Sequence, residues 1–321
     1  MIYNSILGFS DKWLWDFWLA QDGADYHLFY LQAPKALKDP EQRHWNVSIG
    51  HSVSKDLYNW KHLPDAIHPG GKNCLHEYTT WTGSIIRHNQ LWYFFYTSTE
   101  KSDKGLIQRV SLATSKDLIK WEKHPQNPLF SADPRYYEIL ESQSWHDEAW
   151  RDPWVFQHPD TGEFHAFITG RTKHGPPESR GVIAHAKSTN LIDWQVLPPV
   201  TKPIAFGTME CPQLVNIQGR YYLLFSVQPG EYVGSNLVGT FYMSADNPLG
   251  PFSEPQPLYA DPIGRLYSGK LVQGPDQQWY FMSWRNMTTY GKFLGDISEP
   301  LPVVTDHAGN LIVIPPLKQV A

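Results

Sequence analysis

The aromatic run Trp92-Tyr93-Phe94-Phe95-Tyr96 belongs to a pattern that occurs five times along this chain. Related runs occupy residues 26–30, 164–168, 221–225 and 279–283. Successive runs begin 66, 72, 57 and 58 residues apart, so the pattern covers the whole sequence. Aromatic residues favour β-strands, and turn residues bound each run, which is typical of a strand in a hairpin. The chain therefore contains five copies of one β-rich unit.

Two further segments accompany the aromatic runs. A leading segment lies about ten residues before each run, at residues 13–18, 81–85, 150–154, 210–214 and 267–271. A trailing segment reads as a strand, a turn that begins with Asp or Asn, and a closing aromatic residue. Its copies are residues 51–60, 112–121, 185–194 and, more loosely, 242–252. A repeat of about four short strands with a signature Trp is typical of a propeller blade.

The repeats predict an all-β fold, a five-bladed β-propeller that forms a single catalytic domain over residues 1–321. We expect no C-terminal β-sandwich domain. The alternative fold is a β-sandwich or a set of small sheets, which also uses short strands at regular spacing. That alternative does not require the same three-part motif five times, so the propeller is the better interpretation.

Charge and composition exclude several classes of protein. The chain has 27 Lys and Arg against 32 Asp and Glu, a net charge of −5, which is not the basic surface of a nucleic-acid binder. Only two cysteines occur, too few for a disulfide framework or a four-thiolate metal site. The 14 Trp and 17 Tyr suit strands and are common platforms for sugar rings.

The sequence shows no feature of a membrane protein. No window approaches 18 consecutive apolar residues. Residues 1–10 contain no basic segment, no apolar core of signal-peptide length and no small-residue cleavage site. We therefore expect a cytoplasmic location, with secretion as the alternative if a signal was removed. The oligomeric state is not predicted by the sequence.

Three acidic residues occupy comparable places in the leading segments. Asp16, Asp152 and Glu210 lie 10, 12 and 11 residues before the aromatic runs of blades one, three and four. The corresponding places in blades two and five hold the small residues 83–84 and 268–269. Because the innermost strand of every blade starts at one mouth of the central channel, we expect the three carboxylates to converge there.

Converging carboxylates among indole rings favour a sugar site over a metal site. Buried carboxylates are costly without cations, a metal or a function. Glycoside hydrolysis needs one protonated and one ionised carboxyl group, and a third acid can bind ring hydroxyls and stabilise the transition state. We therefore expect a small carbohydrate as the partner and neither a metal nor another cofactor. An Asp before Pro, as in Asp152-Pro153, can also simply cap a turn.

Four short motifs resemble those of the fructan-active glycoside hydrolases of families 32 and 68, the clan of invertases, levanases and levansucrases. They are Trp15-Asp16-Phe17-Trp18, Trp81-Thr82-Gly83-Ser84, Arg151-Asp152-Pro153 and Glu210-Cys211-Pro212. The first two look more like family 68, whereas the last looks like family 32.

The resemblance implies roles for individual residues on a five-bladed propeller. Asp16 would be the nucleophile, Glu210 the acid/base and Asp152 the transition-state stabiliser of a retaining mechanism. Ser84 would hydrogen-bond the nucleophile. The residues expected to line the fructosyl subsite are Trp15, Trp81 and Arg151. Three residues late in their blades are further candidates for the leaving-group side: Tyr232, Trp284 and Arg285.

The sequence thus predicts a retaining β-fructofuranosidase that acts on sucrose or a short fructo-oligosaccharide. Two other enzymes stay open, a fructosyltransferase of the levansucrase type and an arabinofuranosidase similar to family 43. A sugar-binding propeller or pseudoenzyme is the alternative outside enzymes. A lectin would be expected to repeat its binding residues in every blade, whereas here the acids differ from blade to blade.

Overall fold

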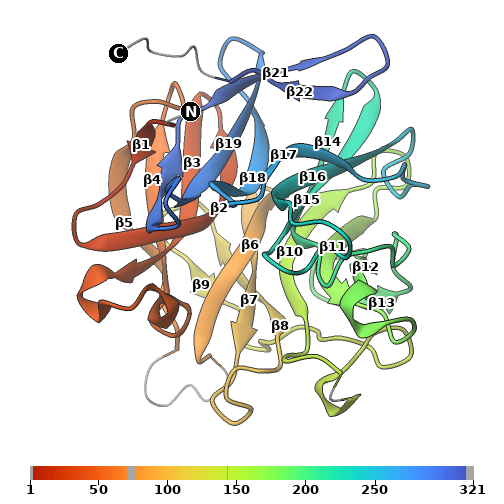
Figure 1. The fold of residues 1–321 in the computed structure, drawn as a ribbon. Helices are drawn as coiled ribbons and strands as arrows, with labels where there is room; N and C mark the ends of the chain where they lie inside the picture. Colours follow the sequence, from red (N-terminus) through yellow and green to blue (C-terminus); the bar gives the residue numbers. More distant parts are fainter. Residues whose placement is uncertain (1–2, 71–76, 143, 316–321) are drawn as a thin grey trace.

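The described residues of the computed structural model, 3–70, 77–142 and 144–315, form five antiparallel sheets around a central channel (Figure 1). The innermost strands contact one another in the closed order β2, β6, β10, β14, β18 and back to β2. This arrangement is a five-bladed β-propeller, as the repeats predict. None of the helices in the described residues has the length and apolar character needed to cross a membrane.

Blades one to four each contain four strands in sequence order. Blade one comprises β2 (Lys12–Asp22), β3 (Asp25–Pro34), β4 (Ser48–Ser54) and β5 (Lys61–Ile67). Blade two comprises β6 (Thr79–His88), β7 (Leu91–Thr99), β8 (Arg109–Ser115) and β9 (Glu122–Lys123). Blade three comprises β10 (Trp150–Gln157), β11 (Phe164–Arg171), β12 (Gly181–Ser188) and β13 (Gln195–Leu197). Blade four comprises β14 (Glu210–Ile217), β15 (Arg220–Val227), β16 (Val238–Ala245) and β17 (Gln256–Asp261).

Blade five closes the ring with a strand from the other end of the chain. Its strands β18 (Leu266–Gln273), β19 (Trp279–Met287) and β20 (Phe293–Ser298) are followed by β1 (Ser5–Leu7), which pairs with β20. A hairpin of β21 (Leu301–Thr305) and β22 (Leu311–Val313) adds to the first half of β19. Four short 3₁₀ helices lie in loops: η1 (Lys35–Leu37), η2 (Pro40–Trp45), η3 (Leu140–Ser142) and η4 (Pro177–Ser179).

The three-part repeat of the sequence corresponds to three strands of each blade. The leading segments lie on the innermost strands, the aromatic runs on the second strands and the trailing segments on the third. In three blades the trailing turn has the same chemistry, because an Asp or Asn carboxyl or carboxamide oxygen accepts backbone N–H groups. These acceptors are Asp56, Asp117 and Asn190. The closing Trp then donates its indole N–H to a backbone carbonyl of the same turn.

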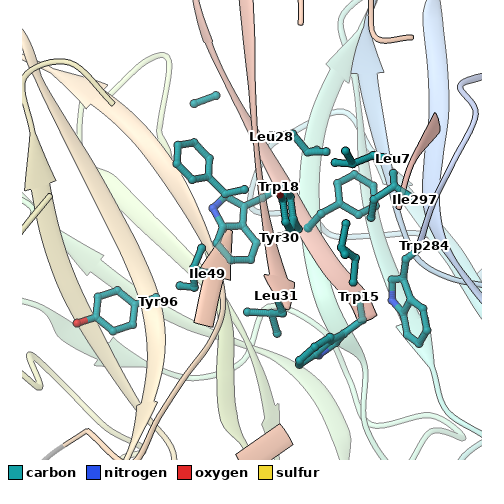
Figure 2. Packing of buried hydrophobic residues seen from close by; sticks show 14 of the residues in the cluster. Leu7, Trp15, Trp18, Leu28, Tyr30, Leu31, Ile49, Tyr96, Trp284 and Ile297 are labelled. Atoms are coloured by element: carbon teal, nitrogen blue, oxygen red, sulfur yellow. The ribbon is translucent and has the colours of Figure 1, made fainter. Parts of the chain in front are cut away.

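Aromatic side chains fill the seams between blades. In the seam of blades one and two, Trp18 and Phe29 pack at steep angles against Phe94, with ring centroids 5.3 and 5.6 Å apart. Figure 2 shows the same cluster reaching Tyr96 on one side and Trp284 of blade five on the other. Burial of such large rings is the main stabilising contribution to a fold of short strands.

Every innermost strand carries a β-bulge near its start. The ladder to the second strand skips residue 16 in β2, residue 82 in β6, residues 152–153 in β10, residues 211–212 in β14 and residues 268–269 in β18. In the last three blades the first bulge residue has a left-handed φ of 60°, 53° and 51°. Bulges re-aim side chains and are frequent near functional sites.

Two buried histidine pairs occupy equivalent positions in blades one and three. His27 Nδ1 lies 2.9 Å from His51 Nε2, and His165 Nδ1 lies 2.8 Å from His185 Nε2. Burial lowers the pKa of His51 and His185 to about 3 and that of His165 to about 4. The pKa of His27 is also lowered, mainly by burial. The folded protein therefore holds neutral imidazoles that an unfolded chain protonates below a pH of about 6.5.

The histidine pairs predict a loss of stability in acid. As the pH falls from 7 to 4, the unfolded chain takes up protons that the folded chain does not, so the free energy of unfolding decreases. The contribution of the four histidines should lower the melting temperature by about 5 °C or more over this range, and proton uptake by the folded chain at Asp152, whose pKa is about 6, opposes part of that fall. The double substitution His51→Gln and His185→Gln should flatten that dependence. Thermal denaturation at a series of pH values measures the effect. If the melting temperatures of the wild type and the double variant fall in parallel, the histidine pairs are not the cause.

Candidate active site

The five bulges define two layers of side chains at one mouth of the channel. Residues at the bulges form the first layer: Asp16, Thr82, Asp152, Cys211 and Ser268. Residues just before the bulges form the second layer: Trp15, Trp81, Arg151, Glu210 and Tyr267. The three acids predicted from the sequence therefore converge, although Glu210 lies one residue earlier in its strand than Asp16 and Asp152 do in theirs.

Asp16 has a different donor for each carboxylate oxygen. Trp284 Nε1 donates to Oδ1 at 3.0 Å, and Thr82 Oγ1 donates to Oδ2 at 2.7 Å. The thiol of Cys211 lies 3.5 Å from the same Oδ2. Burial, with the charge of Glu210 adding to it, raises the pKa of Asp16 above its usual value, although the Thr82 hydrogen bond opposes this effect. The donors fix the orientation of the carboxylate in the channel.

Asp152 is held by neutral donors. Its Oδ2 accepts hydrogen bonds from Thr169 Oγ1 at 2.9 Å and from the Cys211 backbone N–H at 3.0 Å. Burial raises the pKa of Asp152 to about 6, with the nearby Glu210 and Asp16 adding to the effect and Arg151 opposing it. The raised pKa means that Asp152 holds its proton to a higher pH than an exposed aspartate does.

Glu210 is surrounded by donors to its ionised form. Arg151 Nη2 lies 2.6 Å from Oε1, Tyr267 O–H donates to Oε2 at 2.6 Å, and the Gln228 carboxamide donates to both oxygens. Burial by itself would raise the pKa of Glu210, but the guanidinium of Arg151 and these hydrogen bonds hold it below its usual value. In the free site Glu210 is the most strongly ionised of the three acids.

Two buried cations balance the acids. Arg151 also lies 3.2 Å from Asp147, and it donates to the side-chain oxygen Oε1 of Gln108 at 3.0 Å. Lys270, which is 2 % exposed, donates to the Cys211 carbonyl oxygen, and its pKa is lowered by burial although Asp16 and Asp152 favour its charge. The site therefore combines the three predicted acids and Asp147 with two cations, which makes the burial of charge tolerable.

Aromatic residues from blades one and two form the wall beside the acids. Trp81 donates its indole N–H to the His44 carbonyl oxygen at 2.8 Å, and the rings of Trp15 and His44 are 6.0 Å apart. Burial lowers the pKa of His44 to about 4, so its ring is neutral. The short helix η2, which contains His44, therefore covers the predicted sugar-binding tryptophans. None of the sequence motifs described above includes this loop.

Among the predicted site residues, Ser84 has a different role from the one expected. The hydroxyl group of blade two that hydrogen-bonds Asp16 is that of Thr82, whereas Ser84 Oγ accepts the backbone N–H of Val155 at 2.9 Å and joins blade two to blade three. The physical reason is the bulge, which turns Thr82 into the channel and returns Ser84 to the regular ladder opposite Phe95. Gly83 is needed between them, because a Cβ there would overlap the Phe95 carbonyl oxygen.

The three residues proposed for the leaving-group side, Tyr232, Trp284 and Arg285, have different surroundings in the structure. Trp284 contacts Asp16 directly, as described above. Arg285 is paired with Asp296, with N–O distances of 2.5 and 2.7 Å, and Tyr232 packs against the ring of Phe206. Neither of these two contacts the acids. The donors Tyr267, Gln228, Thr169 and Lys270 were not singled out from the sequence, although Tyr267 and Lys270 lie in the fifth leading segment.

One group of residues in the described part of the chain has the spacing to hold a metal ion. Oxygen atoms of Asp16 and Asp152 and the sulfur of Cys211 all lie within 4.8 Å of one another. However, burial and the neighbouring carboxylates raise the pKa of the Cys211 thiol well above its usual value, and Lys270 is beside it. A protonated thiol and an adjacent ammonium group make this a poor cation site.

A five-bladed propeller with three converging carboxylates beside tryptophan rings has the carboxyl groups that glycoside hydrolysis requires. The family model of the glycosyl hydrolases family 32 N-terminal domain matches residues 18–295. The chain therefore belongs to this family. The match begins at Trp18 and so does not include Asp16. Asp16 lies in the motif Trp15-Asp16-Phe17-Trp18, which looks more like the corresponding motif of family 68.

This chain is similar to individual proteins over different lengths. The cell-wall β-fructofuranosidase of Pisum sativum is 30% identical over 59% of this chain, which covers 32% of that protein. The extracellular sucrase of Zymomonas mobilis is 26% identical over 84% of this chain and 73% of its own length. The solved inulosucrase of Halalkalicoccus jeotgali bound to kestose has a TM-score of 0.78 and 19% identity, covering 98% of this chain and 90% of that one. The chain thus spans about a third of the length of the pea relative.

The bulge geometry predicts that Gly83 is essential for stability. Gly83→Ala places a methyl group against the Phe95 carbonyl oxygen, and we expect a loss of about 2–4 kcal/mol in the free energy of unfolding. Ser84→Ala in the same strand removes one hydrogen bond and should cost about 1 kcal/mol. Denaturant unfolding measures both. Equal losses for the two variants would contradict the role assigned to Gly83.

Proposed function

We propose that this chain is a retaining glycoside hydrolase that acts on a β-fructofuranoside, namely sucrose or a short fructo-oligosaccharide. The observation that carries the proposal is the convergence of Asp16, Asp152 and Glu210 in one channel of a family 32 propeller. Two of the relatives, a β-fructofuranosidase and a sucrase, support the choice of substrate.

In the proposed first step, Asp16 attacks the anomeric carbon of the fructosyl unit. The bond to the leaving oxygen breaks as a carboxylate ester forms, and Glu210 gives its proton to that oxygen. In the second step Glu210 takes a proton from water, which attacks the same carbon and releases Asp16. The hydrogen bonds from Trp284 and Thr82 hold Asp16 in one orientation for the attack.

Asp152 is the proposed stabiliser of the charged transition state. It lies close to both of the other acids, and its hydrogen bonds to Thr169 and the Cys211 backbone hold it in place. A carboxylate at this position can bind ring hydroxyls and favour positive charge that develops on the sugar ring. Its pKa of about 6 leaves it largely ionised at neutral pH.

The acid role of Glu210 requires a change on substrate binding. In the free site Arg151 and Gln228 favour its ionised form. Hydroxyl groups of the bound sugar that engage these two donors would weaken that support, and the pKa of Glu210 would then rise within the closed channel. Arg151 therefore serves both as a sugar ligand and as a control on the proton of Glu210.

The catalytic assignment predicts the behaviour of two variants. Asp16→Ala and Glu210→Gln should each lower kcat for release of reducing sugar from sucrose by about 10⁴-fold, because each removes a group that acts on the reacting bond. Kestose, inulin, levan and an aryl arabinofuranoside complete the substrate panel. Free fructose as the product indicates hydrolysis, whereas longer oligosaccharides indicate fructosyl transfer. Turnover of the arabinofuranoside alone would overturn the proposed substrate.

Stereochemistry tests the retaining mechanism separately. Carbon-13 NMR of a substrate labelled at C2 of the fructosyl unit should show the β-anomer of fructofuranose as the first product, because two displacements restore the original configuration. Initial formation of the α-anomer would instead indicate a single displacement by water, and Asp16 would then act as a base.

The hydrogen bond between Tyr267 and Glu210 predicts a shift of the pH profile. Tyr267→Phe removes a donor to the ionised carboxylate, so the pKa of Glu210 rises. Because Glu210 must be protonated to act, the alkaline limb of kcat/KM should move up by about 0.5–1 pH unit. Tyr280→Phe, which removes a hydrogen bond to the surface residue Asp276, is the matched control. A pH profile of kcat/KM that has a lower maximum but an alkaline limb at the same pH would exclude this role of Tyr267.

A further inference from the structure

A groove lies on the face of the propeller opposite the acids, between blades four and five. Glu210 is the first residue of β14 and Tyr267 the second of β18, whereas the groove is lined by residues at the far ends of these strands. At a rise of about 3.3 Å per residue, the length of β14 places the groove roughly 20 Å from Glu210. The groove has a volume of about 460 Å³, which is within the range of small-molecule sites.

The lining of the groove is polar but uncharged. Five of its ten residues carry a carboxamide: Asn216 and Gln218 from blade four, and Gln273, Gln277 and Gln278 from blade five. No Asp, Glu, Lys, Arg or His is among the lining residues. Each carboxamide offers both a donor and an acceptor, which are the partners that sugar hydroxyl groups need. The groove therefore suits a neutral, polyhydroxylated ligand.

Some of these carboxamides are anchored and others are available for a ligand. Asn216 accepts the Gly219 backbone N–H at 3.0 Å, and Gln273 donates to the Gln277 carbonyl oxygen at 3.1 Å. The side chains of Gln218, Gln277 and Gln278 are not hydrogen-bonded to any group in the described part of the chain. All three are exposed, so a ligand can pair with them without breaking a bond within the protein.

Trp279 supplies an aromatic platform in the groove. It pairs with Gln273 and with Val303 in the sheet of blade five, and it packs against the core cluster that contains Ile217. The indole is half-buried, so its position is set by the core while part of it stays accessible. Rigid indole rings bind the apolar faces of sugars at little entropic cost.

We propose that this groove is a second carbohydrate-binding site, which holds a segment of a fructan chain whose end reaches the acids on the other face. The choice of fructan rests on the proposed function, whereas the groove itself is a separate observation. A site about 20 Å from Glu210 cannot bind the sugar unit that is being cleaved. It can keep a long substrate attached between cleavages and raise the effective concentration of chain ends.

The test separates binding at the groove from catalysis. Asp16→Ala serves as the parent, and native electrophoresis is run through gels that contain inulin or levan. The parent should be retarded by at least one polysaccharide. Adding Trp279→Ala should weaken binding about tenfold, and the double substitution Gln218→Ala and Gln278→Ala should have a similar effect. The double substitution removes no buried contact and therefore keeps the test valid if Trp279→Ala impairs folding.

Tyr290→Ala is the matched control. Tyr290 is 97 % exposed in the turn after β19, at the opposite end of that strand from Trp279. Its removal should leave the retardation unchanged. Retardation of the groove variants equal to that of the parent would overturn the proposal, and so would a parent that neither polysaccharide retards.

A second assay distinguishes failure of this inference from failure of the proposed function. With Asp16 intact, the groove variants should retain the wild-type kcat/KM for sucrose but show a KM for the retarding polysaccharide that is about tenfold higher. Retardation that depends on Trp279 in a protein that releases no sugar would support the groove and overturn the proposed function. A loss of sucrose activity in the groove variants would show that the two sites are not separate, against this proposal.

Discussion

The burial of three carboxylates around one narrow channel is the constraint on which the rest of the site depends. Burial raises the pKa of Asp16 and of Asp152, and the charge of Glu210 adds to this effect at both residues. Such a group is stable only with partners, and four of the five blades supply them. Arg151 comes from blade three, Gln228 from blade four, Thr82 from blade two, and Lys270, Tyr267 and Trp284 from blade five.

The bulges let five similar strands present different side chains to the channel. A regular strand would alternate its side chains between the two faces of its sheet. The bulges instead turn one or two residues per blade into the channel, and in blades three to five this requires a left-handed residue at Asp152, Cys211 and Ser268. One layer then holds Asp16 beside Thr82, and the next layer joins Arg151 to Glu210 and Glu210 to Tyr267. Non-glycine residues in this conformation store strain, which the surrounding sheets must support.

Residues that recur at a fixed place in the repeats could be predicted from the sequence. Contacts between residues of different blades could not. The acids and the turn motifs recur in the repeats, so their positions could be read along the chain. The partner of Asp16 was assigned to Ser84 instead of Thr82, because a bulge of one residue is not visible in the sequence. Gln228 and Tyr267 contact Glu210 from positions 18 and 57 residues further along the chain, and no local pattern identifies such pairs.

The sequence by itself determined the architecture, because five copies of an alternating aromatic unit can bury their rings only against one another. It also determined which blades carry acids, since Asp16, Asp152 and Glu210 recur near the start of innermost strands. Only the tertiary structure decided the protonation of those acids, because burial and the distances to Arg151 and Lys270 set their pKa values. The groove with Trp279 likewise exists only in the folded ring, since its residues come from separate blades that meet when the propeller closes.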